Sequence, residues 1–440
     1  MQDFVFNKAA PTIMHVDINS CFATIEQQAN PLLRGKPVVV AAYTTNNGCV
    51  LTASKEAKLY GIKTGMRVRD AKYLYPRLIV LPSDPDKYRV VNQQLTALLM
   101  KYSSNISVES IDEMVIDFRH TPKLSMLNDQ SPTRPPASFD EDPTRQARQV
   151  TNEEVKNKMI RIAEEIKKRV KSEIGEWITV SVGIAPNRYL AKVASGLEKP
   201  DGLRWITKET IVSILKKMKL EDLCGIKEGN ARRLKSVGIY TPLGMFYADS
   251  NTLKRGFHSI IGRNWWQKIH GFDHSKNSGH VNKTFGQSYA MSKFLLPIDS
   301  RVWQILSQLV MKMGRRLRSD GFSSRGVAVS LLFEDHTHWH TQELQEEPLF
   351  ADNDLYQKIW RMLQNAQERD IRILAISCYQ LHKDLYDQQS LLFDENKRRN
   401  LTRAIDAVQE KFGAFIITPA RMIGMEHRVM DRIAFGKTSL

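Results

Sequence analysis

The order of the regular elements in the first 185 residues constrains the fold more than any other feature of this sequence. Apolar runs and helical spacing alternate there with turn signals, and each pattern has the length of one element. The expected elements are a strand over 12–17, a helix over 20–29, a hairpin of two strands over 106–110 and 114–118, a helix over 152–172 and a strand over 178–184. This is the order of a ferredoxin-like layer, in which helices cover an antiparallel sheet. The pattern therefore predicts an α+β fold.

The rest of the chain divides by composition. Residues 119–150 are rich in Pro, Ser, Asp, Thr and Arg, which bury too little apolar area to offset the entropy of ordering, and predict a mobile surface insertion. After Lys199-Pro200 the pattern is mainly helical to about Gly271. A polar linker and a second α+β unit follow, and a charged tail is expected from Lys383.

The net charge of +16 narrows the list of partners to polyanions. The apolar runs are far shorter than the roughly 20 residues of a membrane helix, and no lipidation or secretory signal is recognised. Four scattered cysteines without a C-x-x-C pair indicate neither a disulfide framework nor a zinc site. We expect a cytoplasmic protein that binds nucleic acid and no membrane.

Three acidic residues stand where catalysis could use them. Asp17 ends the first strand, and Asp112 and Glu113 lie at the predicted tip of the hairpin. Nucleotidyl transfer by two divalent ions requires about three converging carboxylates, and magnesium prefers such oxygen ligands. The backbone carbonyl of Ile18 could add a further ligand. Glu109 and Asp117, also on the hairpin, are expected to be solvated sheet positions.

These residues carry a family resemblance. The segments 17–22 (DINSCF), 110–113 (SIDE) and 181–187 (SVGIAPN), with Lys192 and Lys199-Pro200, resemble the Y-family translesion DNA polymerases. The similarity is greatest to the DinB branch, with UmuC-like features near residues 47–50, and it extends over nearly the whole chain. The family is built as a right hand with a ferredoxin-like palm, small fingers, a helical thumb and an α+β little finger.

The resemblance implies a domain for each part of the chain. The palm is expected over 1–30 and 70–195, the fingers over 31–69, the helical thumb with a helix-hairpin-helix over 196–272, the linker over 273–285, the little finger over 286–382 and a tail with a clamp-binding peptide over 383–440.

The resemblance also assigns roles in the reaction. Asp17, Asp112 and Glu113 match the ligands of two Mg²⁺ ions, and Phe22 matches the aromatic gate that excludes a ribose 2′-hydroxyl by collision. Lys192 matches a lysine that neutralises the triphosphate. Three fingers residues are expected to contact the nucleotide, namely Thr52, Lys55 and Lys58; the DinB pattern has tyrosine and arginine in place of the two lysines. Asn19 replaces a common aspartate.

Further residues are expected to hold DNA or a protein partner. Gly225, Lys227 and Gly229 lie in the segment that resembles a helix-hairpin-helix, although Lys227 stands where a second glycine is usual; a plain helical turn is the alternative. Backbone contacts of the little finger are expected from Lys312, Arg315, Arg316 and Arg325, whose alternative is a solvated helix face. Gln389, Leu391, Leu392 and Phe393 resemble the peptide that binds the bacterial sliding clamp.

The resemblance thus implies a monomeric DNA-directed DNA polymerase that extends a primer-template with deoxynucleoside triphosphates, at low fidelity and without proofreading. One alternative is a catalytically inactive scaffold of the same family that is bound to the clamp. A nucleotide cyclase with the same two-metal chemistry and an architectural DNA-binding protein are the others. Retention of the three carboxylates and of Lys192 argues against an inactive scaffold.

Overall fold

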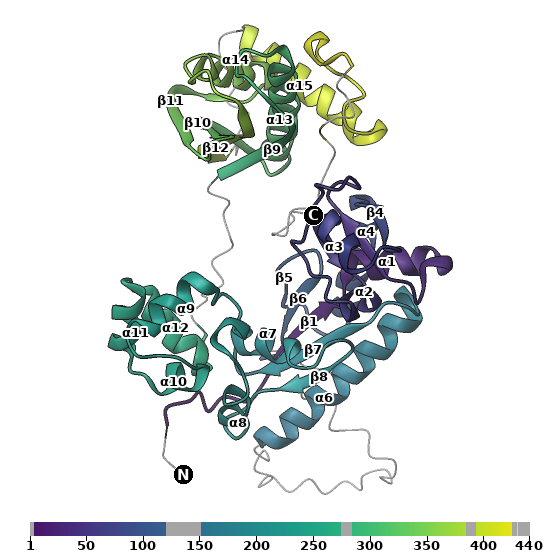
Figure 1. Ribbon diagram of the computed structural model, residues 1–440, viewed down its shortest axis with the longest axis vertical. Helices are drawn as coiled ribbons and strands as arrows, with labels where there is room; N and C mark the ends of the chain where they lie inside the picture. Colours follow the sequence, from purple (N-terminus) through teal and green to yellow (C-terminus); the bar gives the residue numbers. More distant parts are fainter. Residues whose placement is uncertain (1–3, 120–150, 274–283, 384–392, 425–428, 430–440) are drawn as a thin grey trace, which may run out of the picture. The chain divides into compact units, whose positions relative to one another are not determined.

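The computed structural model describes residues 4–119, 151–273, 284–383, 393–424 and 429. The chain forms two compact units, the first ending near residue 276 and the second following it (Figure 1). The predicted insertion lies outside the described residues from 120 to 150, as does most of the predicted linker. Within the described residues, no helix combines the length and the hydropathy that crossing a membrane requires.

A five-stranded sheet forms the centre of the first unit. Its order is β5-β6-β1-β7-β8, with β1 antiparallel to both of its neighbours. The strands are β1 (Ile13–Ile18), β5 (Ile106–Val108), β6 (Glu113–Asp117), β7 (Val180–Ala185) and β8 (Leu203–Trp205). All six residues of β1 are buried, because helices cover both faces of the sheet at this strand. The predicted α+β layer is confirmed.

Three helices pack on one face of this sheet. They are α1 (Cys21–Ala29), α4 (Pro85–Met100) and α6 (Asn152–Arg169), the last running along the sheet (Figure 1). Helix α6 begins with a capping box between Thr151 and Glu154 and passes into a π-helical turn, η2 (Val170–Ile174). Its buried residues follow helical spacing and meet Met14, Val16 and Ile18 of β1 in one core.

Helix α7 (Arg188–Gly196) covers the other face, and Gly183 determines how closely it approaches. A Cβ atom on Gly183 of β7 would lie 2.0 Å from the carbonyl oxygen of Ala191 and 2.3 Å from the nitrogen of Ser195. Only glycine permits this contact of helix and strand backbones. The close packing brings the side chains of α7 over the centre of the sheet.

A small three-stranded sheet, ordered β3-β2-β4, stands between α1 and α4 in the chain. Its elements are η1 (Pro31–Leu33), β2 (Val38–Ala41), β3 (Val50–Ala53), α2 (Lys55–Leu59), α3 (Val68–Leu74) and β4 (Ile79–Pro82). Ser54 caps α2 by accepting a bond from the Ala57 N–H. The fingers predicted over 31–69 cover only part of this sheet, because β4, which pairs with β2, lies inside the range predicted for the palm.

A helical part completes the first unit. It contains α8 (Ile211–Leu215), η3 (Leu220–Asp222), α9 (Glu228–Lys235), α10 (Pro242–Tyr247), α11 (Ser250–Phe257) and α12 (Ile261–Ile269). Its apolar core is continuous with α7 and with Ile13 and Val115 of the sheet. The Asn187 side chain caps α7 and also donates to the carbonyls of Lys268 and Phe272, which ties this part to the sheet.

The second unit is a four-stranded antiparallel sheet, ordered β11-β10-β12-β9, with helices on one face. Its elements are β9 (Thr284–Leu295), α13 (Ser300–Ser319), β10 (Phe322–Phe333), β11 (His338–Leu349), α14 (Asp352–Leu363), β12 (Ile371–Lys383), α15 (Phe393–Phe412) and η4 (Ala420–Met422). The second α+β unit of the sequence interpretation has this architecture.

Residues 393–424 contain helix α15 and the turn η4 where the sequence predicts a polar tail. Helix α15 is joined to α13 through Arg318, whose side chain is only 4% exposed and forms ion pairs with Asp406 at 2.6 Å and Asp352 at 2.8 Å. Farther along, Arg421 donates to the Ser307 hydroxyl and lies over the Tyr356 ring, 3.9 Å from its centroid. The docking depends on buried polar contacts and not on an apolar stripe, so hydrophobic periodicity does not reveal it.

Candidate active site

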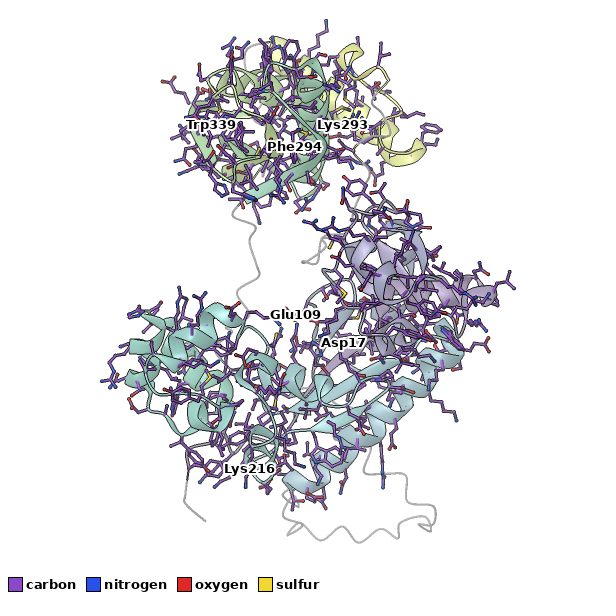
Figure 2. All side chains as sticks on the ribbon, viewed as in Figure 1. Asp17, Glu109, Lys216, Lys293, Phe294 and Trp339 are labelled. Atoms are coloured by element: carbon purple, nitrogen blue, oxygen red, sulfur yellow. The ribbon has the colours of Figure 1, made fainter. Side chains whose placement is uncertain are left out.

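Two carboxylates face each other at the centre of the first unit. Asp17 of β1 is paired in register with Glu113 of β6, so their side chains leave the sheet on the same face. Asp112 precedes β6 in a turn, and its carbonyl accepts a bond of 2.9 Å from the Ile18 N–H. Figure 2 labels Asp17 at this position in the first unit. The structure therefore brings together the carboxylates that the sequence singled out.

Each facing carboxylate is paired with a lysine. Lys199 Nζ lies 2.7 Å from Asp17 Oδ2, and Lys192 of α7 forms an ion pair with Glu113. Burial alone would raise the pKa of Glu113, but contacts with His15 and Lys192 lower it to about 2. Burial would lower the pKa of Lys192, yet its hydrogen bond with Glu113 raises it above the usual value. Both partners are therefore fully charged at neutral pH.

Asp112 is held differently. The Ser110 hydroxyl donates to its Oδ1 at 2.5 Å, and the buried Asn92 side chain on α4 donates to the Ile111 carbonyl at 2.8 Å, which fixes the turn. Burial raises the pKa of Asp112, the Ser110 bond lowers it, and the charges of Asp17 and Glu113 raise it again. This repulsion is the electrostatic signature of carboxylates that share one site.

The donor set suits a hard divalent cation, because the three carboxylates lie near enough for the charges of Asp17 and Glu113 to act on Asp112. In the described part of the chain, however, no three acidic, histidine or cysteine side chains already converge as ligands of one ion. The reason is visible in the contacts, since Asp17 and Glu113 are turned to their lysines and Asp112 to Ser110. The residues fit a metal after a change of side-chain rotamers.

Of the three fingers residues predicted to contact nucleotide, one reaches the carboxylates. Lys58 Nζ donates to the Ser20 hydroxyl at 2.8 Å. Its pKa is lowered by burial and by the charge of Lys199, while Asp17 opposes the shift. Lys55 instead lies over the Trp177 ring, 4.5 Å from its centroid, and Thr52 pairs with Val40 inside the small sheet. The structure does not bring these two residues to the carboxylates.

Phe22 lies on α1, directly after the strand that carries Asp17. It is 1% exposed and stacks on Tyr88 of α4, with ring centroids 4.4 Å apart and planes at 10°. The Tyr88 hydroxyl donates to Glu26 at 2.9 Å, which fixes the position of the Tyr88 ring. The Phe22 ring therefore has little freedom to move within this core.

The predicted helix-hairpin-helix segment has one glycine that its geometry requires. Gly225 adopts a φ of +86°, whereas Lys227 is extended at the N-cap of α9 and Gly229 lies inside that helix. The side chain of Asn230 donates to the Gly225 carbonyl at 3.0 Å and closes the turn. Lysine in place of the second glycine is therefore compatible with this turn.

The basic residues of the second unit differ in their surroundings. Arg316 is exposed on α13, and Arg315 is half-buried beside it. Lys312 donates to the Val429 carbonyl at 2.8 Å, and Arg325 of β10 donates to the Gln345 carbonyl at 3.0 Å.

The predicted clamp peptide falls largely outside the described residues, which exclude Gln389, Leu391 and Leu392. Phe393 is the first residue of α15, but its side chain is not described.

A cavity of about 830 Å³ opens beside the carboxylates. Asp17 and Glu113 contribute to its wall, as do the lysines 192 and 199. Trp205 lies at the same cavity, and residues of α8 extend its lining into the helical part. This space is large enough to admit a small-molecule ligand.

Three residues of this region were missed by reasoning from the sequence: His15, Asn92 and Lys199. Lys199 was quoted only as part of a motif, and its pairing with Asp17 shows its place in the site. Alternation along β1 could have placed His15 on the same face as Asp17. Nothing in the sequence connects Asn92 with the turn that it holds.

Comparison with known proteins agrees with this arrangement. The impB/mucB/samB family matches residues 16–196, and the C-terminal domain of that family matches residues 282–391, together well over half of the chain. DNA polymerase IV of Moorella thermoacetica is 29% identical over 92% of this chain and 94% of its own length. DNA polymerase IV 1 of Bacillus subtilis is 28% identical over 97% of this chain and 96% of its own.

Solved structures show the same fold. A Y-family DNA polymerase chimera of Dbh and Dpo4 superposes with a TM-score of 0.68, at 22% identity over 84% of this chain and 99% of its own. An insertion ternary complex of Dbh DNA polymerase gives 0.54, covering 83% of this chain and 98% of its own. The right-hand architecture predicted from the sequence is thus confirmed. The chain belongs to the impB/mucB/samB family, the Y family of DNA-directed DNA polymerases that carry out translesion synthesis.

Proposed function

We propose that Asp17, Asp112 and Glu113, with the Ile18 carbonyl, hold two Mg²⁺ ions and that the chain transfers deoxynucleotides to a primer at this site. The observation that carries the proposal is the register of Asp17 opposite Glu113. Asp112 lies near both, since its pKa is raised by burial and also by the charges of these two carboxylates. When bound, the ions activate the primer hydroxyl and stabilise the charge on the triphosphate.

We propose that the lysines at the site exchange their carboxylate partners for the phosphates of the nucleotide before this step. Lys192 and Lys199 are paired with Glu113 and Asp17, and Lys58 lies near Lys199. A triphosphate offers these three ammonium groups stronger acceptors than single carboxylates do. Once the lysines turn to the phosphates, the carboxylates are available to cations. Lys55 and Thr52 remain weaker candidates for nucleotide contact, because their contacts lie elsewhere.

Phe22 is proposed to select the sugar. Its ring is held by Tyr88 and by the surrounding core, so a 2′-hydroxyl would collide with a group that cannot move aside.

The duplex backbone is proposed to contact Gly225, Lys227 and Gly229 of the first unit and Arg315, Arg316 and Arg325 of the second. Lys312 is the weakest member of the predicted DNA-binding set, because its ammonium group is bonded to Val429.

The test of the metal assignment is Asp112→Asn, which removes a charged ligand and changes little else. Primer extension should fall by about a thousandfold or more, because several kcal/mol of transition-state stabilisation depend on the ions. The matched control is Glu109→Gln in the same segment, where Glu109 is paired with Arg188 at 3.3 Å and lies outside the carboxylate group. Its extension rate should stay within a few-fold of the parent.

Two results would overturn the assignment: parental extension by the Asp112 variant, or equal losses in both variants. Duplex affinity, measured in parallel, should be unchanged in both. If the parent chain bound DNA without extending the primer, the inactive scaffold or the architectural DNA-binding protein would replace the proposal, and binding to a clamp would favour the scaffold.

We also propose that Gln389, Leu391, Leu392 and Phe393 bind a sliding clamp, and that the enzyme is a cytoplasmic monomer. Replacing Leu392 and Phe393 by Ala should shorten the products made on clamp-loaded templates and leave single-nucleotide insertion without clamp unchanged. The reason is that each apolar side chain buried in a clamp pocket contributes roughly 1.5 to 3 kcal/mol to tethering. Equal losses with and without clamp would mean that this segment serves the enzyme itself.

A further inference from the structure

His15 is a buried histidine in the middle of β1 for which the proposed chemistry has no use. Its side chain is 1% exposed, and β6 and β7 flank its strand. Nδ1 lies 3.0 Å from the Ser195 hydroxyl oxygen of α7, which also lies 2.9 Å from the Lys192 carbonyl oxygen, so the one hydroxyl proton can be donated to either group. Nε2 lies 3.6 Å from Glu113 Oε2.

The second ring nitrogen, Nε2, is one of ten buried side-chain atoms in the described residues that have no hydrogen-bond partner, and it lies beside a proposed metal ligand. Most buried polar atoms in native proteins have one, so an exception at a functional site calls for an explanation. The distance to Glu113 exceeds hydrogen-bond length by only a few tenths of an ångström, and a small rotation of the carboxylate would close it.

The contact between Nδ1 and Ser195 determines the orientation of the His15 ring. With the proton on Nε2, the single hydroxyl proton of Ser195 turns from the Lys192 carbonyl to Nδ1, and the Nε2–H points at Glu113. Ser195 is in place because Gly183 lets α7 lie directly on β7. Backbone packing therefore aims the imidazole at one carboxylate oxygen.

We propose that His15 is a positioning residue that fixes the carboxylate of Glu113 for metal binding. This inference rests on the proposed function of Glu113. Lys192 contacts the same oxygen, Oε2, and would leave it when the triphosphate arrives. His15 is then the contact that stays and keeps the carboxylate from rotating. Partners of this kind, one step behind a metal ligand, commonly contribute 10- to 100-fold to metal affinity.

The experiment compares His15→Leu, which keeps the volume and removes the donor, with His15→Gln, which keeps a donor. Mn²⁺ is titrated by electron paramagnetic resonance onto the full chain with primer-template and a deoxynucleotide whose α,β bridge is an imido group. His15→Leu should weaken Mn²⁺ binding by about 10- to 100-fold, with duplex affinity unchanged. His15→Gln should recover most of this loss.

Several outcomes would overturn the proposal. The first is parental Mn²⁺ affinity in a folded His15→Leu variant, and the second is an equal loss in both variants at unchanged melting temperature, which would indicate packing alone. If His15→Leu does not fold, Ser195→Ala decides, because it frees the ring without removing it. A few-fold weaker Mn²⁺ affinity in that variant supports the proposal, and parental affinity contradicts it.

Asp112→Asn in the same titration separates this inference from the proposed function. Parental Mn²⁺ binding in that variant would refute the metal site itself. Weak binding by Asp112→Asn together with parental binding by His15→Leu would refute only the role of His15.

Discussion

At the scale of single residues, the centre of the site consists of balanced charges. Asp17 pairs with Lys199, which follows the end of α7, and Glu113 pairs with Lys192 of α7 on the same face of the sheet. A partly buried charge without its partner is costly, so the pairs stabilise the site before substrate arrives. The metal ions can replace the lysines as partners of the carboxylates, and the triphosphate can replace the carboxylates as the partner of the lysines. Every charged side chain then keeps a partner of opposite charge.

Phe22 offers a prediction about sugar selection. Phe22→Leu should raise the incorporation of ribonucleotides relative to deoxynucleotides at least several-fold, because the smaller side chain leaves space beneath the 2′-carbon. Leucine is the better choice than alanine, since truncating a buried phenylalanine to alanine costs about 3 to 5 kcal/mol of stability. The measurement is the ratio of kcat/KM for the two sugars on one template. An unchanged ratio in a folded variant would assign Phe22 to the core alone.

Some of these residues were predictable and others were not. Asp17, Asp112 and Glu113 follow from strand ends and a turn, because local pattern determines where such elements stop. The partners of the carboxylates depend on strand register and on the approach of α7, which no local pattern encodes. Lys55 illustrates what the sequence does not reveal. Its spacing from Lys58 predicts a shared helix face, but its ammonium group lies over the Trp177 ring and not near the carboxylates.

At the scale of elements, the contact of α7 with β7 carries the geometry of the site. Gly183→Ala would place a Cβ 2.0 Å from a backbone oxygen, so helix and strand must separate. Overpacking of this kind costs about 1 to 3 kcal/mol or more, with about 2 to 4 °C lost from the melting temperature per kcal/mol. Extension should also fall, since Lys192 and Ser195 move with the helix.

The control is Gly196→Ala at the end of the same helix, where an added Cβ meets no atom within 4 Å. Its melting temperature should be unchanged or slightly higher, because alanine favours helix more than glycine does. Calorimetry of both variants checks the pair. Equal melting temperatures would mean that the α7 contact tolerates a methyl group.

Elements differ in how far the sequence revealed them. Four of the five strands of the central sheet and helices α1 and α6 were predicted to within a few residues, because burial on a sheet or a helix face imposes a period on the apolar residues. Strand β8 and helices α4 and α7 were not predicted, and β8 lies where a mainly helical pattern was expected. Helix α15 was not predicted either, since few of its residues are apolar and its docking depends on Asp406 reaching a buried arginine. Such a contact has no periodic signal.

At the scale of the whole molecule, the net charge of +16 predicts strongly salt-dependent DNA binding. Arg316→Ala should reduce the slope of log affinity against log salt by about 1, as expected for one lost phosphate contact. Lys312→Ala should leave the slope unchanged, because the Val429 carbonyl holds that ammonium group. Fluorescence anisotropy at several salt concentrations gives both slopes. The reverse ranking would show that Lys312 turns to DNA and Arg316 does not.

The ion pairs of Arg318 have a consequence for synthesis on the ribosome. Strands β9 to β12 and helices α13 and α14 leave the exit tunnel before α15, so Arg318 first meets Asp352 and only later Asp406. Until then a nascent second unit carries an incompletely neutralised guanidinium at the surface that α15 will cover. The proposed metal ligands lie between residues 17 and 113, so their part of the chain leaves the tunnel long before α15 completes the second unit.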